Sequence, residues 1–284
     1  MARATGSSVS LVCRVLVVSR SWFYYRRRLR RKSRSCRRPD VEVAIERILA
    51  GRPATYGYRR IHALLIREGI WTNPKTVWRI LRRRDWLSST RSRLGKTHRR
   101  HDGQVSVPEP NRRWATDITG IKAWNGEKGR LAVIIDCADR MVLSWRFARR
   151  MPSEELQEMV REAVFGRFGA EKEKAQHIEF LSDNGPEYAC RKLRRVLQGF
   201  GMVVCRTPRC SPESNGLAEA FFGSFKRDYV YQEELESLEV VARKLPEWIK
   251  DYNGVAPHSA LGMKSPVQFY ADWMSKISHK PVQI

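Results

Sequence analysis

The sequence predicts an α/β protein in which a mixed five-stranded sheet with flanking helices follows small all-helical regions. In the second half of the chain, short apolar segments alternate with helical patterns in the order βββαβαβαα, which suits a mixed sheet covered by helices. The first hundred residues show helical patterns only. With 284 residues, of which 42% are apolar, the chain is long enough to bury a core.

The positive charge is concentrated at the beginning of the chain. The net charge is +24, and residues 1–100 hold 27 Lys and Arg against 5 Asp and Glu, so the later residues are almost balanced. Such a segment attracts polyanions, of which nucleic acid is the commonest inside cells. An anionic membrane surface is the competing partner, but no stretch approaches the ~18 apolar residues that span a bilayer. We expect DNA as the partner, and no membrane.

Cysteines and histidines form no pattern typical of a metal site. The six cysteines show no CxxC spacing, and the six histidines are scattered without zinc-ligand spacing. The apolar segment 9–18 resembles a signal peptide only faintly, because Arg14 interrupts it. We expect a cytoplasmic protein with reduced thiols.

Residues 1–38 form a basic N-terminal region with two short helices expected within residues 8–28. Ser19 or Ser21 can cap the second helix. Val17 falls where glycine would make the turn easier. A helix-turn-helix and a plain helical hairpin both fit this pattern.

Residues 39–87 predict a helix-turn-helix-like domain with helices at about 41–50, 58–68 and 74–86. Gly69 ends the second helix, while Asn73 caps the third and Pro74 occupies its first turn. In the third helix Val77, Ile80 and Leu81 face inward. Four cations point outward: Lys75, Arg79, Arg82 and Arg83. A solvated charged face is the alternative, but the regional charge favours DNA binding.

A basic linker at 88–110 separates this domain from a catalytic core at 111–272, with a tail at 273–284. In the core we expect strands at about 114–124, 131–136, 142–147, 176–181 and 202–206. Helices are expected at about 153–168, 189–199, 215–230 and 237–252.

Three acidic residues of the core lie where packing alone does not explain a carboxylate. Asp117 interrupts an apolar strand, Asp183 ends a strand before a tight turn, and Glu219 stands on a largely apolar helix. Each has a simpler interpretation: a buried hydrogen-bonded Asp, an Asx turn and an exposed helix residue, with Glu213 as a rival to Glu219.

Three carboxylates converging on one point would repel one another unless cations lay between them. Mg²⁺ prefers a few carboxylates together with water and phosphate oxygens, and a pair of such ions promotes phosphoryl transfer. The acids therefore suggest a site for two Mg²⁺ ions with Asp117, Asp183 and Glu219 as both metal ligands and catalytic residues.

The spacing of these acids and the strings around them resemble a known superfamily. Thirty-five residues separate Asp183 from Glu219, and Lys226 follows seven residues later. This spacing resembles the DD(35)E signature of retroviral integrases and insertion-sequence transposases. Further strings are similar to the OrfB transposases of bacterial insertion sequences: WATD at 114–117, IIDCADR at 134–140, LSDNG at 181–185, SPESNGLAE at 211–219, FKRDY at 225–229, PHSALG at 257–262 and, in the helix-turn-helix region, YGYRRI at 56–61.

The resemblance implies a ribonuclease H-like core, dependence on Mg²⁺ or Mn²⁺, and two reactions at one site. Water first frees a 3′-hydroxyl at the element's end, and that hydroxyl then attacks another phosphodiester. Lys226 matches the basic residue that contacts DNA near the reacting end. Support roles are expected for Asn184, Gly185, Asn215 and Gly216. A homo-oligomer on DNA at the bacterial nucleoid and an upstream OrfA product as fusion or partner are also implied.

Two other functions remain open from the residues. A DNA-binding regulator or partner subunit would use the core only as an assembly platform, and a lost acid would favour it, yet none is lost. A ribonuclease that cuts RNA in a hybrid would share the fold and metal but would not require the basic helical region. The sustained heptads of the family's upstream segment do not occur here.

Overall fold

The computed structural model describes residues 8–24, 38–51, 55–87, 107–206 and 216–278, and the chain forms two compact units, Met1–Ala44 and Ile45–Ile284. In the first unit, helix α1 (Val9–Val15) begins at Ser8, whose hydroxyl accepts a hydrogen bond from the N–H of Leu11. A second helical segment over residues 20–24 is capped by Ser19. Val17, between the two, has a left-handed φ of 53°, as the expected turn requires.

The helix-turn-helix-like region contains α3 (Pro39–Ala50), α4 (Tyr58–Arg67) and α5 (Pro74–Arg83). The apolar faces of α4 and α5 are buried as the periodicity predicts, and Gly69 after α4 has a φ of 77°. The Asn73 side chain accepts from the N–H of Lys75 at 2.8 Å, which confirms the expected cap of α5. The outer face of α5 is left to charged residues.

The five predicted strands form one mixed sheet in the order β3-β2-β1-β4-β5. Its strands are β1 (Arg113–Lys122), β2 (Lys128–Asp136), β3 (Val142–Ala148), β4 (Glu179–Ser182) and β5 (Val203–Arg206). Strands β1, β2 and β3 pair antiparallel with one another, whereas β4 runs parallel to both β1 and β5. The central strand β1 therefore has a long antiparallel neighbour on one side and a short parallel one on the other.

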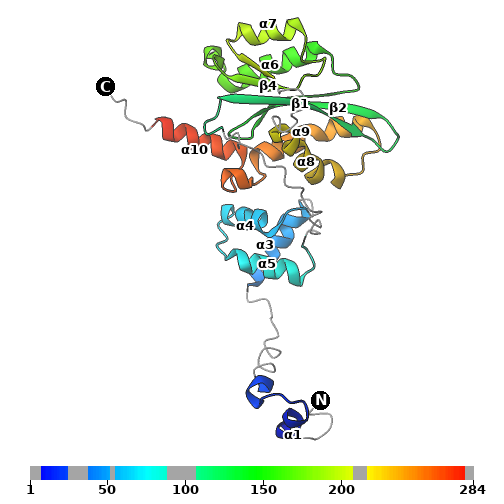
Figure 1. The fold of residues 1–284 in the computed structure, drawn as a ribbon, viewed down its shortest axis with the longest axis vertical. Coiled ribbons are helices and arrows are strands. Elements are labelled where there is room, and N and C mark those ends of the chain that lie inside the picture. The colour runs from blue at the N-terminus through cyan, green and yellow to red at the C-terminus, as the bar shows by residue number, and fades with distance from the viewer. Residues whose placement is uncertain (1–7, 25–37, 52–54, 88–106, 207–215, 279–284) are drawn as a thin grey trace. The chain divides into compact units, whose positions relative to one another are not determined.

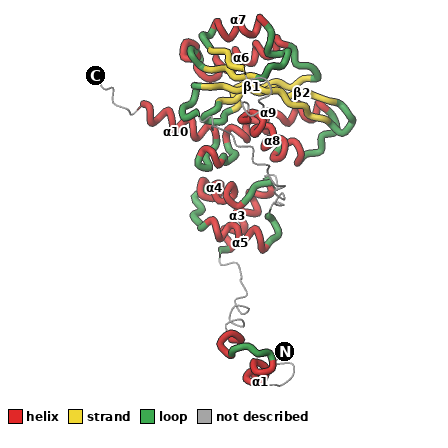
Figure 2. The backbone as a smooth tube through the Cα atoms, in the orientation of Figure 1, coloured by secondary structure: helices red, strands yellow, loops and turns green. Residues whose placement is uncertain are grey.

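Helices cover both faces of this sheet, as Figure 1 shows. One face packs against α6 (Ser153–Phe168) and α7 (Arg191–Gly199), with the 3₁₀ turn η1 (Lys172–Ala175) before β4. The other face packs against α8 (Gly216–Asp228) and α9 (Leu238–Gly254), which are joined through η3 (Val230–Gln232). The sheet thus lies between two helical layers, each with its own apolar core (Figure 2).

The last described elements are η4 (Ser259–Leu261) and α10 (Pro266–Ser278), a helix that the sequence did not predict. Because α10 runs through residue 272, the expected boundary between core and tail falls inside it. No helix among the described residues is long and apolar enough to cross a bilayer. The four cysteines in the described ranges are free thiols: Cys13, Cys137, Cys190 and Cys205.

A buried ion cluster joins the end of β2 to α6. The guanidinium of Arg167, 3% exposed, pairs with Asp139 and lies 3.9 Å from Asp136, and both carboxylates are fully buried. Asp136 also accepts from the N–H groups of Ala138 and Asn111 at 2.8 and 2.7 Å. Asp136 and Asp139 are therefore structural residues that fix the turn after β2.

Candidate active site and nucleic-acid interface

Asp117 lies level with the end of β4 although it is in the middle of β1. The parallel ladder between these strands pairs Trp114 with Phe180 and Ala115 with Leu181. Asp117 and Asp183, the first residue after β4, each lie two residues beyond the last pair of this ladder. The β1–β4 ladder thus ends just before the two acids, while β1 continues to Lys122 along β2.

Asp183 begins a tight turn that the side chain itself closes. Its Oδ1 accepts a hydrogen bond from the N–H of Gly185 at 2.9 Å, which is the Asx turn that the sequence suggested. A Cβ atom added to Gly185 would lie 3.0 Å from this same oxygen, so the turn has little room for any other residue. Asn184 is exposed at the tip of the turn. Gly185 thus shapes the turn beside the carboxylate.

Glu219 is exposed in the first turn of α8. The buried side of this helix is anchored in the core by Phe221, Phe222 and Phe225. Gly216 is the first residue of α8, whereas Asn215 and the rival acid Glu213 lie outside the described residues. The aromatic residues therefore act as packing anchors that present Glu219 to solvent.

The charges of the three acids act on one another at Asp117. Burial, together with the negative charges of Asp183 and Glu219, raises the pKa of this carboxyl to about 6. The N–H of Ile118, which donates to Asp117 Oδ1 at 2.8 Å, and the positive charge of Lys226 oppose this rise. The strand, the turn and the helix thus bring their acids into one electrostatic cluster.

Lys226 lies near Asp117, two helical turns beyond Glu219 on α8. Its Nζ donates to the hydroxyl of Thr119 at 2.6 Å, and Thr119 is on the same side of β1 as Asp117. Partial burial lowers the pKa of Lys226, while the charge of Asp117 raises it. Thr119 was not predicted as a site residue, because its role depends on a partner 107 positions away.

The donor set suits a hard divalent cation. Carboxylate oxygens with water access are the ligands that Mg²⁺ and Mn²⁺ prefer, and Asp183 and Glu219 add negative charge beside Asp117. Within the described ranges, no three His, Cys, Asp or Glu side chains converge closely enough to hold an ion together. The backbone therefore brings the acids into electrostatic range but not into ligand geometry.

The basic face of α5 is a second candidate site. Lys75, Arg79 and Arg82 are exposed at positions i, i+4 and i+7, and Arg83 is exposed beside them. Trp78 is on the same side of the helix, 36% exposed, with the Arg82 guanidinium 5.1 Å from its ring centroid. Trp78 was not predicted as a site residue, because an aromatic residue at helical spacing usually packs inward. This face offers cations for phosphates and one apolar surface.

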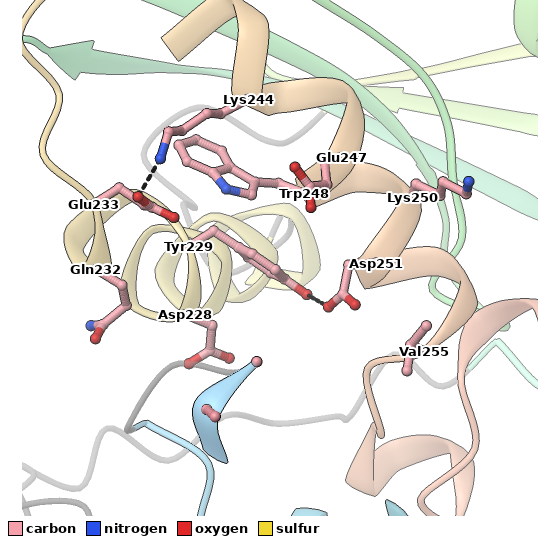
Figure 3. Close-up of a pocket in the computed structure, with 12 residues that line it drawn as sticks. Asp228, Tyr229, Gln232, Glu233, Lys244, Glu247, Trp248, Lys250, Asp251 and Val255 are labelled. Atoms are coloured by element: carbon pink, nitrogen blue, oxygen red, sulfur yellow. Dashed lines mark hydrogen bonds and ion pairs between the residues drawn. The ribbon is translucent and has the colours of Figure 1, made fainter. Parts of the chain in front are cut away.

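A recess of about 650 Å³ lies at the other end of α8. Figure 3 shows Tyr229 donating to Asp251 at 2.8 Å and Lys244 paired with Glu233. None of the three acids lines this recess, and Asp228 at its wall is nine positions beyond Glu219, roughly 13 Å along the helix. The recess is therefore separate from the carboxylate cluster.

Comparison with known proteins gives matches along almost the whole chain. Two family models described as integrase core domain match residues 107–212 and 201–266, and a model described as HTH-like domain matches residues 37–93. Transposase InsD for insertion element IS2A/D/F/H/I/K of Escherichia coli is 36% identical over 278 residues, which cover 94% of this chain and 92% of the relative. InsD for IS2-9 of strain K12 matches equally, over 90% of its length.

Solved structures support the fold. A chain of the simian T-cell lymphotropic virus intasome in complex with PP2A regulatory subunit B56 gamma matches with a TM-score of 0.50 and 20% identity, covering 78% of this chain and 72% of that chain. This likeness and the strand order confirm the predicted ribonuclease H-like fold. Because the 36% identity extends over nearly the full length of both sequences, the chain belongs to the family of insertion-element transposases with an integrase core domain.

Proposed function

We propose that this protein cuts and joins DNA at the ends of its insertion sequence, with Asp117, Asp183 and Glu219 as the catalytic carboxylates. The observation that carries the proposal is the placement of the acids: Asp117 is on β1, Asp183 directly follows the adjacent parallel strand β4, and Glu219 is on α8. Lys226 of the same helix bonds to Thr119, two residues beyond Asp117, so α8 reaches β1 beside this carboxylate. A site that collects negative charge beside a cationic side chain suits a phosphodiester with divalent cations.

The three acids would hold two Mg²⁺ or Mn²⁺ ions. When bound, such ions activate the attacking oxygen and stabilise the charge on the leaving oxygen. In the first reaction, water forms a bond to the phosphorus at the element's end and the 3′-oxygen leaves as a hydroxyl. In the second, this hydroxyl bonds to a target phosphorus and displaces another DNA oxygen. One phosphorus–oxygen bond forms for each that breaks, so neither step needs an energy source.

The chain's own residues position the DNA. Lys226, held by Thr119, is suited to contact a phosphate next to the reacting bond. Asn184 and Gly185 shape the turn of Asp183, and Asn215 comes directly before Gly216, the first residue of the helix of Glu219. The face of α5 would bind DNA further from the reaction.

The proposed organisation keeps the limits predicted from the sequence. It consists of a basic region at 1–38, a DNA-binding domain at 39–87, a linker at 88–110, a catalytic core at 111–272 and a tail at 273–284. We further propose that the protein acts at the bacterial nucleoid as an oligomer that pairs two element ends. An upstream OrfA product is the proposed fusion or partner.

The test is nicking and joining of a labelled duplex that carries the element's own end. We expect Mg²⁺-dependent release of a 3′-hydroxyl end, followed by its transfer to a plasmid, and neither reaction on a duplex of shuffled sequence. Binding of the element end without cleavage, with and without the upstream OrfA product, would contradict the proposal and favour a DNA-binding regulator.

Metal binding has a readout that does not depend on catalysis. The pKa of Asp117 is about 6 in the folded protein against an ordinary 3.8. Folding therefore takes up a proton between these values, and the metal-free protein loses stability as pH rises through this window. At pH 7.5 a divalent ion relieves the repulsion, so Mg²⁺ at a hundred times its Kd is expected to stabilise the fold by about 2.7 kcal/mol. Thermal melting with and without Mg²⁺ measures this.

The control for metal binding is Asp117→Asn. Asparagine carries no charge, so this variant is expected to lose the pH dependence between about 4 and 6 and most of the Mg²⁺ stabilisation. An equal Mg²⁺ effect in both proteins would mean that the ions bind elsewhere.

The α5 face makes a prediction on salt dependence. Replacing Lys75, Arg79 or Arg82 by alanine is expected to reduce the slope of log K against log salt by about 0.9 for each phosphate that the variant no longer neutralises. Arg47→Ala is the matched control, because Arg47 is also an exposed arginine but pairs with Glu68. Fluorescence anisotropy from 50 to 300 mM salt checks the slopes, and an equal change in all variants would indicate only a general effect of net charge.

A further inference from the structure

An ion pair next to the Asp183 turn has no part in the site described so far. Arg130 on β2 and Glu187 are joined by a contact of 2.6 Å between Nη1 and Oε1. The Glu187 side chain is 19% exposed and that of Arg130 is 42% exposed. Arg130 pairs in the β1–β2 ladder with Gly120, next to Thr119. The pair therefore links the loop after β4 to β2, the strand on the other side of β1.

Glu187 and Asp183 are pressed against the same glycine. A Cβ atom added to Gly185 would lie 3.0 Å from Asp183 Oδ1 and 3.0 Å from Glu187 Oε2. These two carboxylate oxygens are therefore separated by no more than twice that distance. The other oxygen of Glu187 is the one that contacts Arg130. Glu187 is thus a fourth carboxylate beside the cluster, with its charge balanced by a guanidinium.

The next residue anchors the same turn to β1. The hydroxyl of Tyr188, a buried side chain, lies 3.2 Å from that of Thr116, which directly precedes Asp117. Consecutive residues of the turn therefore reach two neighbouring strands, Glu187 to β2 and Tyr188 to β1. Two anchors in different directions restrict the turn more than either would alone.

We propose that Arg130 and Glu187 are a positioning pair that holds the Asp183 turn against the sheet and keeps the Asp183 carboxylate aimed at Asp117. The pair deepens the proposed function and rests on it. Without Arg130, the charge of Glu187 would repel Asp183 across Gly185, and the turn would lose its link to β2. The expected consequence is weaker binding of the divalent ion, with DNA affinity unchanged.

The experiment compares Arg130→Met, Glu187→Gln and the double variant Arg130→Glu/Glu187→Arg in the full chain. Mg²⁺ titrations followed by thermal melting give the ion's apparent Kd, nicking gives the Mg²⁺ concentration for half-maximal rate, and anisotropy gives the Kd for DNA. Both single variants are expected to weaken Mg²⁺ binding by about tenfold, the lower end for loss of a residue that orients a ligand. The charge-swapped variant is expected to recover most of this loss.

Arg149→Met is the matched control, because Arg149 pairs with Glu127 at the far end of the β1–β2 hairpin. It is expected to leave Mg²⁺ binding unchanged. Unchanged Mg²⁺ binding in Arg130→Met, or loss of DNA affinity instead, would overturn the positioning role and make Arg130 a phosphate contact. If Mg²⁺ does not raise the melting temperature of the unsubstituted protein, the result is a different one. It overturns the proposed metal site and, with it, the positioning role of the pair.

Discussion

Asp117→Asn is expected to lower the nicking rate by about a thousandfold while DNA affinity stays within about twofold, in the range for loss of one preorganised electrostatic group. Asparagine keeps the shape of aspartate and its acceptor oxygen for the N–H of Ile118, so β1 should fold as before. It removes the charge at the centre of the cluster, where Asp183 and Glu219 act. Single-turnover nicking at fixed Mg²⁺ measures the loss.

Asp183→Asn and Glu219→Gln are expected to show losses of the same order. Glu239→Gln is the matched control, because Glu239 occupies the first turn of α9 as Glu219 does in α8. It is expected to retain full activity. Nicking that survives one of the three substitutions would remove that acid from the site.

Arg167→Met is expected to destabilise the protein by about 3–5 kcal/mol, the usual cost of removing one partner from a buried ion pair. The variant leaves Asp136 and Asp139 buried without their guanidinium. It also removes the hydrogen bond from Arg167 Nε to Asn111 at 2.8 Å and the stacking of Arg167 on Tyr270. Urea denaturation measures the change.

The loss in Arg167→Met is expected to depend on pH. Burial already raises the pKa of Asp139 to about 6, and Arg167 opposes this rise. Without the arginine the folded-state pKa rises further, so stability is lost as pH increases, and the deficit should be smaller at pH 5 than at pH 8. Arg161→Met on the same helix is the control, because its exposed pair with Glu158 contributes at most about 1 kcal/mol. Equal losses in the two variants would contradict a special role for the buried cluster.

Periodicity and local patterns were sufficient to predict the elements of the sheet layers. Alternating or continuous apolar runs placed all five strands, and capping residues such as Asn73 fixed where helices begin. Helix α10 was not predicted, although Tyr270, Trp273, Met274 and Ile277 stand at positions i, i+3, i+4 and i+7 of a helical stripe. Only its first residue, Pro266, is buried, so this stripe is not part of either apolar core.

Residue type and spacing were sufficient to predict the acids of the candidate site, but not the residues that contact them. The three acids stand out because a carboxylate is unexpected at each position. Thr119 does not stand out, since it becomes relevant only through the Nζ of Lys226. Arg130 and Glu187 are 57 positions apart, and β1 lies between β2 and β4 in the sheet, so only the folded topology brings this pair together. Contacts between distant segments leave no local pattern.

The three acids are carried by parts of the molecule with different rigidity. Asp117 and Asp183 are fixed to adjacent strands of one hydrogen-bonded sheet, whereas Glu219 depends on the aromatic packing of a single helix. The first two should keep their spacing until the whole domain unfolds. Mild heating is then expected to detach α8 first, so that DNA cleavage is lost while the sheet stays folded. Hydrogen exchange would register this order as earlier loss of protection in α8 than in β1.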